Sequence, residues 1–589
     1  MEFIAHNLAP IMFAGLICFL LVGFPVAFSL GACGLFFAFI GIELNVLPEA
    51  LLQALPLRIY GIMQNDTLLA IPFFTLMGLI LERSGMAEDL LDTIGQLFGP
   101  IRGGLALAVI FVGALLAATT GVVAASVISM GLISLPIMLR YGYDRRLAAG
   151  VIAASGTLAQ IIPPSLVLII IADQLGRSVG DMYKGAFLPG LMLTGFYASY
   201  VILLAVIKPQ WVPAMPPEAR TLREDNGKSG VPSLLVLTAI CTAASIYVAK
   251  NMPALHTWWS GEAVDKVALD ETIVVSMCFG VALAFVAASF NKITRLGLLS
   301  RAAERVTFAL IPPLLLIFLV LGTIFLGVAT PTEGGAMGAL GAIIMAVIRG
   351  RLSMSLLKQA LNTTTKLSCF VVFILVGATI FGLTFQGVDG PLWVEHLLSG
   401  LPGGQLGFLI VVNIMVFFLA FFLDFFELSF IVVPLLAPVA DKLGIDLIWF
   451  GVLLAINMQT SFMHPPFGFA LFYLRSVAPA KEYMDKVTKK MIAPVTTTQI
   501  YWGAIPFLCI QILMVVLVIT FPGIVSSGLD KAEVYDLDKV RLEMEANMPA
   551  SMEQADPTAG MPGSEAPAAE DDPLKAMQES LSQDAEKKN

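Results

Sequence analysis

Two short polar segments interrupt apolar stretches of this chain, and each is followed by a pair of adjacent prolines. The first segment, Ser155-Gly156-Thr157, lies within the stretch 153–171, ahead of the proline pair at 163–164. Adjacent prolines remove two backbone donors and clash with the preceding turn, so a helix cannot continue through them. In lipid, an interrupted helix is tolerated only where it packs against protein or lines a polar cavity. The pattern therefore predicts a discontinuous transmembrane helix with a polar pocket at its break.

A second segment of the same kind lies 302 residues downstream, where a proline pair at 465–466 matches the pair at 163–164. The polar residues before it read Asn-Met-Gln-Thr-Ser over 457–461. Two interrupted helices at corresponding places in two halves of a chain are typical of the binding site of a secondary transporter. The duplication favours transport over the alternative, a pair of ordinary proline-kinked helices in another kind of membrane protein.

The chemistry of these segments suits a hard cation such as sodium. Hydroxyl, amide and freed carbonyl oxygens can ligate sodium without adding a net charge. The alternative for any single hydroxyl is a hydrogen bond back to its own helix. For Thr157 and Asn457, which lie at the duplicated breaks, ligation or pocket lining is the favoured interpretation.

Four further ionisable residues lie in or beside apolar stretches. A charge at the position of Asp424 or Glu427 costs about 2.5–3.5 kcal/mol inside a membrane, so we expect both to face a polar cavity or each other. His464 precedes the second proline pair, and a hydrogen-bonded structural role is as consistent with it as proton coupling. Glu333 is expected to stabilise a turn between two crossings rather than to contact substrate.

The elements that position these residues follow from the composition of the whole chain. With 589 residues, 58% of them hydrophobic and 13% charged, the chain is expected to be an all-α polytopic membrane protein. Its net charge of −9 arises from the last 68 residues, which carry 15 acidic and 6 basic side chains. This segment has too little apolar surface to form a core and is expected to be disordered. The six cysteines are scattered in apolar spans, so neither a disulfide framework nor a metal site is implied.

Helical hairpins are expected beside both breaks, at about 103–139 and 405–440. The sequence thus divides into four regions: a first inverted repeat at 1–207 with its broken helix at 147–171, a connection with two additional spans at 208–305, a second inverted repeat at 306–521 with its broken helix at 448–475, and an acidic tail at 522–589.

The distribution of basic residues sets the orientation of these regions. Three arginines flank the loop 141–144, whereas only Lys442 flanks the matching loop at 443–446. By the positive-inside rule the first loop is cytoplasmic, and tracing the crossings places its counterpart outside, so the repeats are antiparallel. Further basic clusters mark cytoplasmic loops: Lys292, Arg295, Arg301 and Arg305 in one, and Arg349, Arg351, Lys358 and Lys366 in the next.

Four motifs resemble the large membrane subunit of TRAP transporters, the tripartite ATP-independent periplasmic family. They read GYDRRLAAGVIAASGTLAQIIPPS (142–165), ATPTEGGA (329–336), LDFFELSFIVVPLLAPVADKLGID (423–446) and NMQTSFMHPPFG (457–468). The resemblance extends through nearly all of the apolar chain in the family's order. It implies a multi-pass protein of the bacterial inner membrane and a sodium-coupled importer of small organic acids with no covalent cofactor.

The resemblance also implies partners and a mechanism. The partners are a soluble periplasmic substrate-binding protein and a small four-helix membrane subunit, and nothing indicates nucleic acid. The mechanism is of the elevator type, in which each hairpin tip and its neighbouring broken helix move against a scaffold of the other helices.

Carried over by position, the resemblance implies two sodium sites and a substrate cavity. The first sodium site comprises Thr120, Gly121, Ser155, Gly156 and Thr157. The second comprises Asp424, Asn457, Met458, Thr460 and Ser461. The substrate cavity comprises Thr119, Gln160, Pro163, Pro164, Glu427, Gln459, His464, Pro465 and Pro466.

The chain departs from the family's usual pattern at several of these positions. The first hairpin tip usually reads Ser-Gly-Ser and here reads Thr-Gly-Val over 120–122, so that one side-chain oxygen is missing. His464 replaces a threonine, and Glu427 stands where a small residue is common. The two additional spans are shared with the family's longer members.

Two other classes of function remain open on sequence grounds. A stand-alone ion-coupled carboxylate symporter, or a sodium/proton exchanger, would be built on similar inverted repeats. An intramembrane enzyme is the poorest fit, because no HExxH zinc pair, spaced aspartate dyad or Ser–His arrangement is apparent. No ATP-binding signature occurs, so transport by this chain would draw energy from an ion gradient or another subunit.

Overall fold

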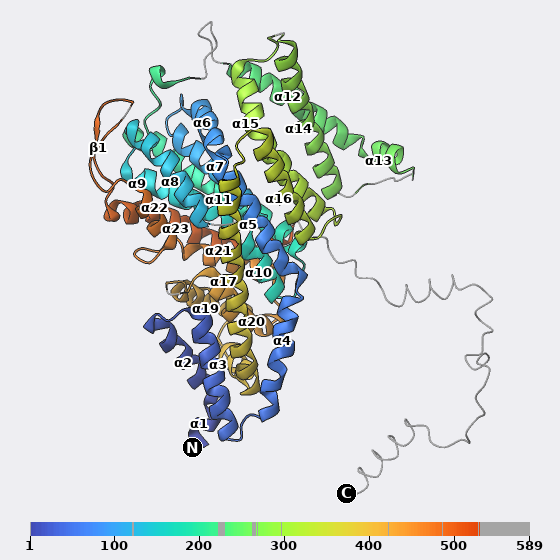
Figure 1. Cartoon of the computed structure of the whole chain (residues 1–589), viewed down its shortest axis with the longest axis vertical. Coiled ribbons are helices and arrows are strands. Elements are labelled where there is room, and N and C mark those ends of the chain that lie inside the picture. The colour runs from blue at the N-terminus through green and yellow to red at the C-terminus, as the bar shows by residue number, and fades with distance from the viewer. Residues whose placement is uncertain are drawn as a thin grey trace, which may run out of the picture. The chain divides into compact units, whose positions relative to one another are not determined.

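The computed structural model describes residues 2–120, 123–221, 230–261, 267, 269–295, 297–421, 423–485, 487–527 and 529 (Figure 1). Within these ranges the regular structure is helical, apart from a two-stranded hairpin that pairs β1 (Tyr483–Met484) with β2 (Met491–Ile492). Nine of the described helices are long and apolar enough to cross a membrane, or up to eleven if each of two bent helix pairs forms one span. The predicted all-α polytopic membrane fold is confirmed. Of the acidic tail predicted at 522–589, residues 522–527 and 529 are described and include α24 (Gly523–Ser526), whereas the remainder lies outside the described residues.

The helices up to the end of the first predicted repeat are α1 (Glu2–His6), α2 (Leu8–Val22), α3 (Val26–Glu43), α4 (Leu55–Met63), α5 (Ala70–Arg83), α6 (Met86–Phe98), α7 (Gly104–Thr120), α8 (Val123–Arg140), α9 (Arg145–Thr157), α10 (Leu166–Gln174) and α11 (Val179–Ile207). The predicted connection contains α12 (Val231–Lys250), α13 (Met252–Ser260) and α14 (Leu269–Thr294). The remaining helices are α15 (Arg301–Phe325), α16 (Pro331–Ile348), α17 (Met354–Gly387), α18 (Gly390–Ser399), α19 (Gly404–Leu419), α20 (Phe425–Lys442), α21 (Leu447–Thr460), α22 (Phe469–Val477), α23 (Thr497–Thr520) and α24 (Gly523–Ser526).

Both predicted broken helices are interrupted where the sequence indicates. The first consists of α9, a single 3₁₀ turn at Leu158–Gln160, a turn through the proline pair, and α10. The second consists of α21, a turn through its own proline pair, and α22. In each case the first helix begins at an aspartate cap: Asp144 accepts hydrogen bonds from the amides of Arg146 and Leu147, and Asp446 accepts one from Trp449. Such caps satisfy amides that have no partner within the helix.

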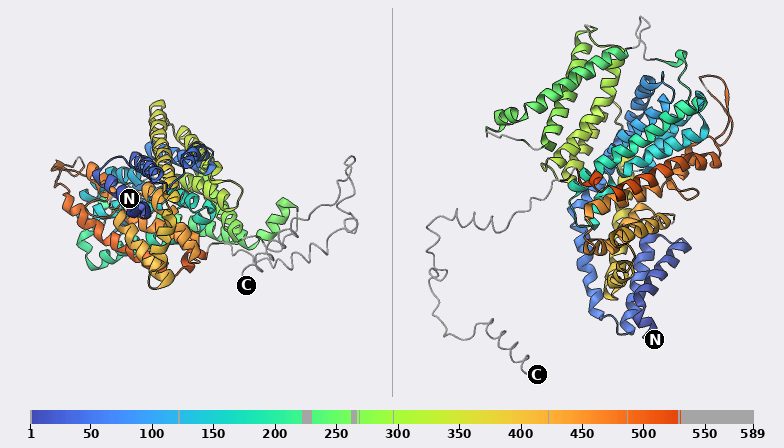
Figure 2. Two further views of the ribbon diagram at one scale, coloured as in Figure 1. Left: turned by 90° about the horizontal axis from the view of Figure 1, so that it is seen from below. Right: turned by 180° about the vertical axis from the view of Figure 1, so that it is seen from behind.

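The predicted hairpins correspond to α7–α8 and α19–α20, and the two additional spans correspond to α12 and α14. Figure 2 shows α12 and α14 on the outer side of α15 and α16. The repeat boundaries and the re-entrant course of the hairpins stay predictions.

Glu333 has the structural role expected for it. Its carboxylate accepts a hydrogen bond from the backbone amide of Thr330, and the Thr330 hydroxyl in turn accepts one from the amide of Glu333. This reciprocal pair is a capping box at the start of α16. It holds the turn between α15 and α16.

An ion pair fastens the loop after the second broken helix to the first hairpin. Arg140, at the end of α8, donates from Nε to both carboxylate oxygens of Asp485, at 3.0 and 3.1 Å. Burial raises the pKa of Asp485, but hydrogen bonds from Thr488 and Arg140 outweigh this effect and bring it to about 2. Asp485 is therefore charged at every physiological pH, and the pair links elements from the two predicted repeats.

Close helix contact at the centre of the protein depends on a pair of glycines. A Cβ atom added to Gly503 on α23 would lie 1.9 Å from the carbonyl oxygen of Arg146 on α9, and one added to Gly150 would lie 2.0 Å from the carbonyl oxygen of Gly503. Glycine is used here because only a bare Cα allows two helix backbones to approach so closely. This contact holds α9 against α23.

We predict that Gly503→Ala forces α9 and α23 apart and lowers the free energy of unfolding by about 1–3 kcal/mol, the usual cost of overpacking. The measurement is thermal unfolding of the purified chain in detergent. Gly195→Ala is the matched control, because a Cβ on Gly195 in α11 meets no atom within 4 Å and alanine is the better helix former. Equal stability of the two variants would contradict the proposed contact.

Candidate functional site at the helix breaks

The two helix breaks meet through a hydrogen bond between side chains. Gln459, at the end of α21, donates from Nε2 to the hydroxyl oxygen of Thr157, at the end of α9, over 3.2 Å. These residues are 302 positions apart, which is the shift that superimposes the two proline pairs. Residues at equivalent positions of the two halves therefore contact each other. Both side chains are fully buried.

Thr157 is the centre of a larger buried network. Its hydroxyl donates to the carbonyl oxygen of Ala154 at 2.8 Å and accepts from Gln459 and from Gln511 Nε2, the latter at 3.4 Å. The Gln511 amide on α23 also donates to the hydroxyl of Tyr197 on α11, at 2.9 Å. A hydroxyl has one proton and two lone pairs, so all three are used at Thr157. A cation bound to this oxygen would have to replace one of its hydrogen bonds.

Some amide side chains near the breaks have buried polar atoms that form no hydrogen bond with a described residue. Within the described residues, both polar atoms of the Gln160 side chain and the Oε1 atoms of Gln459 and Gln511 are buried without a hydrogen-bond partner. Leaving a buried polar group unpaired costs about 1–3 kcal/mol. These oxygens and nitrogens therefore identify the break region as a place where a polar ligand or an ion would gain binding energy.

The second break is fastened to the neighbouring hairpin. Asn457 donates from Nδ2 to the backbone and side-chain oxygens of Asn413 on α19, at 2.8 and 3.0 Å. The Asn457 side-chain oxygen is not used in these bonds. The amide of Asn457 thus positions α21 against the hairpin arm and leaves its oxygen as a possible cation ligand.

Three hydroxyls at the breaks donate to carbonyl oxygens of their own helices. Ser155 donates to Val151, Thr460 to Asn457 and Ser461 to Met458, over 2.6–2.7 Å. Such a bond to the helix's own backbone is the alternative to ion binding that applies to any hydroxyl in a transmembrane helix. Each oxygen keeps lone pairs, so the bonds orient these atoms without preventing ligation. Their assignment to sodium sites stays a prediction.

The first hairpin packs tightly on the first break. A Cβ atom on Gly156 would lie 2.3 Å from Cγ2 of Val127 on α8, and one on Gly113 of α7 would lie 2.6 Å from Cβ of Ser155. The backbone of the first break at Ser155 and Gly156 is therefore in direct contact with the first hairpin. An ion site with ligands from both the break and the hairpin requires such a contact. Gly121 and the side chains of Thr119 and Thr120 lie outside the described part of the chain.

Asp424 and Glu427 form a capping box at the tip of the second hairpin. The amide of Glu427 donates to Oδ1 of Asp424 at 3.0 Å, and the amide of Asp424 donates to Oε2 of Glu427 at 2.9 Å. Each carboxylate thereby satisfies an amide at the start of α20, close to the positive end of the helix dipole. Each carboxylate thus bonds to the backbone amide of the other residue, and the expectation that the two side chains face a polar cavity or each other stays a prediction.

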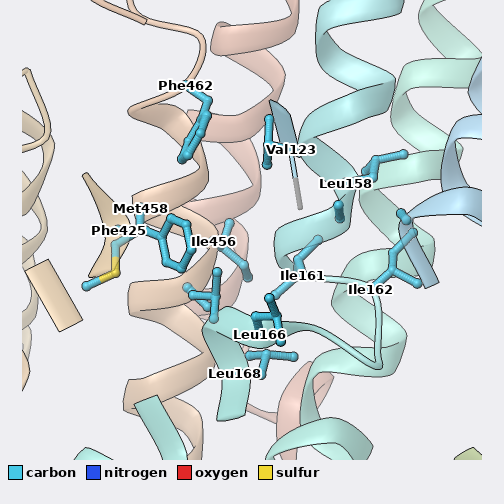
Figure 3. Packing of buried hydrophobic residues seen from close by; sticks show 14 of the residues in the cluster. Val123, Leu158, Ile161, Ile162, Leu166, Leu168, Phe425, Ile456, Met458 and Phe462 are labelled. Carbon is cyan, nitrogen blue, oxygen red and sulfur yellow. The ribbon is translucent and has the colours of Figure 1, made fainter. Parts of the chain in front are cut away.

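A cavity of about 280 Å³ lies between the two hairpins and the second broken helix. Figure 3 shows Val123, Leu166, Phe425 and Phe462 converging on this region from four different segments. Asp424 supplies a carboxylate to its lining. The cavity is mostly apolar and has a single acidic group among its described lining residues.

The described residues that were predicted to line a substrate cavity do not line this one. Gln160, Gln459 and His464 are buried, and neither they nor the two proline pairs are among the described residues that line the 280 Å³ cavity. His464 is enclosed by the rings of Phe417 and Phe421, whose centroids are 4.1 and 4.5 Å from its own. No described residue forms a hydrogen bond with either of its ring nitrogens. The assignment of these residues to substrate binding stays a prediction.

Sequence reasoning missed Gln511, Tyr197 and Asn413. Gln511 and Asn413 each have apolar neighbours on both sides in sequence, and that local isolation is a weak signal, whereas Tyr197 lies close to Thr194 and Ser199 and carries no such signal. Their partners come from helices far away in the chain. Spacing along one segment therefore cannot reveal them.

A family model and similar sequences identify one family. The family model described as "Tripartite ATP-independent periplasmic transporter, DctM component" matches residues 13–264 and 267–524. The chain is 27% identical to the C4-dicarboxylate TRAP transporter large permease protein DctM of Rhodobacter capsulatus, over 79% of this chain and 89% of that protein. It is 26% identical to the isethionate TRAP transporter permease protein DctMQ of Oleidesulfovibrio alaskensis, over 82% of this chain and 63% of that protein. A solved structure, that of the Alcanivorax borkumensis YdaH transporter, is similar at a TM-score of 0.46 and 13% identity, covering 80% of this chain and 88% of that one.

We predict that Tyr197→Phe and Gln511→Leu are coupled in a double-mutant cycle. Because the two side chains share a buried hydrogen bond, the double variant should lose about 1 kcal/mol less unfolding free energy than the two single variants together. The measurement is denaturant unfolding in detergent.

Tyr197→Phe combined with Ser199→Ala is the control cycle. Ser199 bonds only within α11 on its exposed face, at Gly195, so its effect should add to that of Tyr197→Phe. Additive effects in both cycles would show that the buried network contributes nothing beyond its separate parts.

Proposed function

Because the chain belongs to the DctM component family of tripartite ATP-independent periplasmic transporters, as their large membrane subunit, we propose that it imports small organic acids with sodium as the coupling ion. It is a multi-pass protein of the inner membrane. The two matched relatives named above are permeases for C4-dicarboxylates and isethionate, all small organic anions. An organic acid as substrate of this chain is the proposal that follows from them.

The observation that carries the proposal is the meeting of two helix breaks, each packed against a hairpin. At the first break Ser155 and Gly156 contact α7 and α8, and at the second Asn457 contacts α19. Uncharged hydroxyl and amide oxygens are gathered there, and these are ligands that a sodium ion accepts without added charge. Sodium would offset the charge of an arriving carboxylate in a site otherwise surrounded by apolar side chains.

The proposed mechanism is of the elevator type. The broken helices and hairpins are joined to one another by the Thr157–Gln459, Asn457–Asn413 and Arg140–Asp485 contacts. Elements joined in this way can move together as one body against the remaining helices. The proposed partners are a periplasmic substrate-binding protein, which would deliver the substrate, and a small membrane subunit, which would dock on the scaffold.

Partner dependence is the first test of the proposed function. Liposomes that contain only this chain should show negligible uptake of C4-dicarboxylates, whereas addition of the small subunit and the substrate-loaded binding protein should produce sodium-dependent uptake. Robust uptake by the chain alone would instead support a stand-alone symporter.

The ion sites give a second test. Thr157→Ala and Asn457→Ala should each weaken the apparent sodium affinity about tenfold to a hundredfold, since loss of one buried ligand or its support costs roughly 1–3 kcal/mol. The maximum uptake rate at saturating sodium should change less. The measurement is uptake by the full complex against sodium concentration, normalised to folded protein.

Two variants serve as controls. Thr157→Ser keeps the hydroxyl and should keep most of the sodium affinity, and Ser199→Ala removes a hydroxyl on the exposed face of α11 and should leave the curve unchanged. If Thr157→Ala and Asn457→Ala lower only the yield of folded protein, with the wild-type sodium curve in what remains, both residues serve packing.

A further inference from the structure

A second cavity lies at the ends of helices remote from the breaks. It has a volume of about 580 Å³ and is bounded by α6, α14, α15 and α16. Figure 1 shows α14, α15 and α16 side by side, with α6 next to α15. Four basic residues line the cavity: Lys292, Arg305, Arg349 and Arg351.

The carboxylates nearby do not balance these basic residues. Asp89 pairs with both Arg349 and Arg351, at 3.1 and 2.9 Å, and Asp92 pairs with Arg305 at 2.6 Å. Four positive charges thus face two negative ones, which leaves a net charge of about +2 at the cavity.

Donors remain available for a ligand. Within the described ranges no carboxylate pairs with Lys292, whose ammonium lies 4.8 Å from the centroid of the Phe308 ring. Arg305 uses only one of its guanidinium nitrogens in a hydrogen bond to a described residue. Lys292 and about half of the Arg305, Arg349 and Arg351 donors can therefore bind an anion without breaking the ion pairs.

The remaining walls of the cavity are apolar. Phe285 and Phe308 pack edge to face with centroids 5.7 Å apart, and Ala309, Pro312 and Ile348 continue this surface. Phe285 and Ile348 are exposed to 38% and 78%. In a membrane protein such exposed apolar side chains face acyl chains, so one cavity combines a basic part with a lipid-facing part.

The side of the membrane is fixed by the distribution of charge. The positive-inside rule places two basic loops and the helix ends beside them on the cytoplasmic side: Lys292 and Arg305 lie at the ends of α14 and α15 that flank the first loop, and Arg349 and Arg351 lie in the second, after α16. The structure brings residues of these loops and helix ends together around one cavity. The cytoplasmic leaflet carries anionic lipids, and basic pockets between helices on that side bind their headgroups.

We propose that this cavity binds the headgroup of an anionic phospholipid from the cytoplasmic leaflet. The phosphate lies against Lys292 and Arg305, and the glycerol and upper acyl chains lie along Phe285, Phe308 and Ile348. The lipid fills the space between α14, which belongs to the two additional spans, and the helices α15, α16 and α6. It would thereby fasten the additional spans to the remainder of the protein.

The experiment titrates the purified full-length chain in detergent with phosphatidylglycerol and measures bound lipid by native mass spectrometry. Each basic residue near a membrane surface contributes about fivefold in affinity, so Lys292→Gln/Arg305→Gln should bind phosphatidylglycerol about thirtyfold more weakly. Lys292→Gln alone breaks no ion pair with a described carboxylate and should show about a fivefold loss. It keeps the test valid if the double variant folds poorly.

The matched control is Lys358→Gln/Lys366→Gln, which removes two exposed positive charges from the same predicted side of the membrane but away from the cavity. It should bind phosphatidylglycerol as the unmodified chain does, and phosphatidylcholine with the same acyl chains should bind at least tenfold more weakly. Equal losses in the cavity and control variants, or equal binding of the two lipids, would overturn the proposal. Complete displacement of phosphatidylglycerol by millimolar inorganic phosphate would overturn it as well, because the site would then recognise a free anion.

Discussion

Inside a membrane, a polar group that finds no partner within the protein costs free energy, and this constraint explains much of the centre of the structure. A helix interrupted by two prolines leaves donors and acceptors that lipid cannot satisfy. The chain contains two such interruptions and places them against each other, so that Gln459 of one binds Thr157 of the other. Gln511 and Tyr197 extend the network to two continuous helices. The two breaks thus share a side-chain hydrogen bond, so part of the buried polar surface at each break is satisfied by the other.

The sequence was sufficient to predict much of this arrangement. Proline pairs, hydroxyls and small residues are local signals, so both broken helices and both hairpins lie where the sequence indicated, within one or two residues at most ends. The aspartate caps at Asp144 and Asp446 explain part of this accuracy, since a cap defines a helix start through bonds to residues two or three positions away. The turn at Thr330 and Glu333 could be anticipated for the same reason.

Other features could not be predicted because they depend on contacts between distant segments. Asp424 and Glu427 are three residues apart, so the capping box between them could have been predicted from the sequence. The adjoining cavity could not, because Val123, Leu166 and Tyr473 line it from other segments of the chain. Gln511 has no neighbour in sequence that hints at Thr157, which lies 354 residues away. The glycine contact between α9 and α23 is equally invisible, because a glycine in an apolar helix has the same local signal whether or not another backbone lies against it. The family resemblance implies that these helices belong to one fold but does not specify which of their side chains meet.

The hydrogen bonds at the breaks also limit how an ion could act there. Thr157 has no unused lone pair, and Ser155, Thr460 and Ser461 each commit their proton to their own helix. A cation near Thr157 would therefore compete with Gln459 or Gln511 for the same oxygen, and the displaced amide would need a new partner. Gln160, with both polar atoms unpaired, is in the same buried region and belongs to the same predicted half as Thr157. Exchange of partners around one hydroxyl changes contacts in both halves at once, because Gln459 and Thr157 come from different breaks. A ligand that displaced Gln459 from Thr157 would therefore alter a contact that both breaks share, which is a direct route for coupling between them.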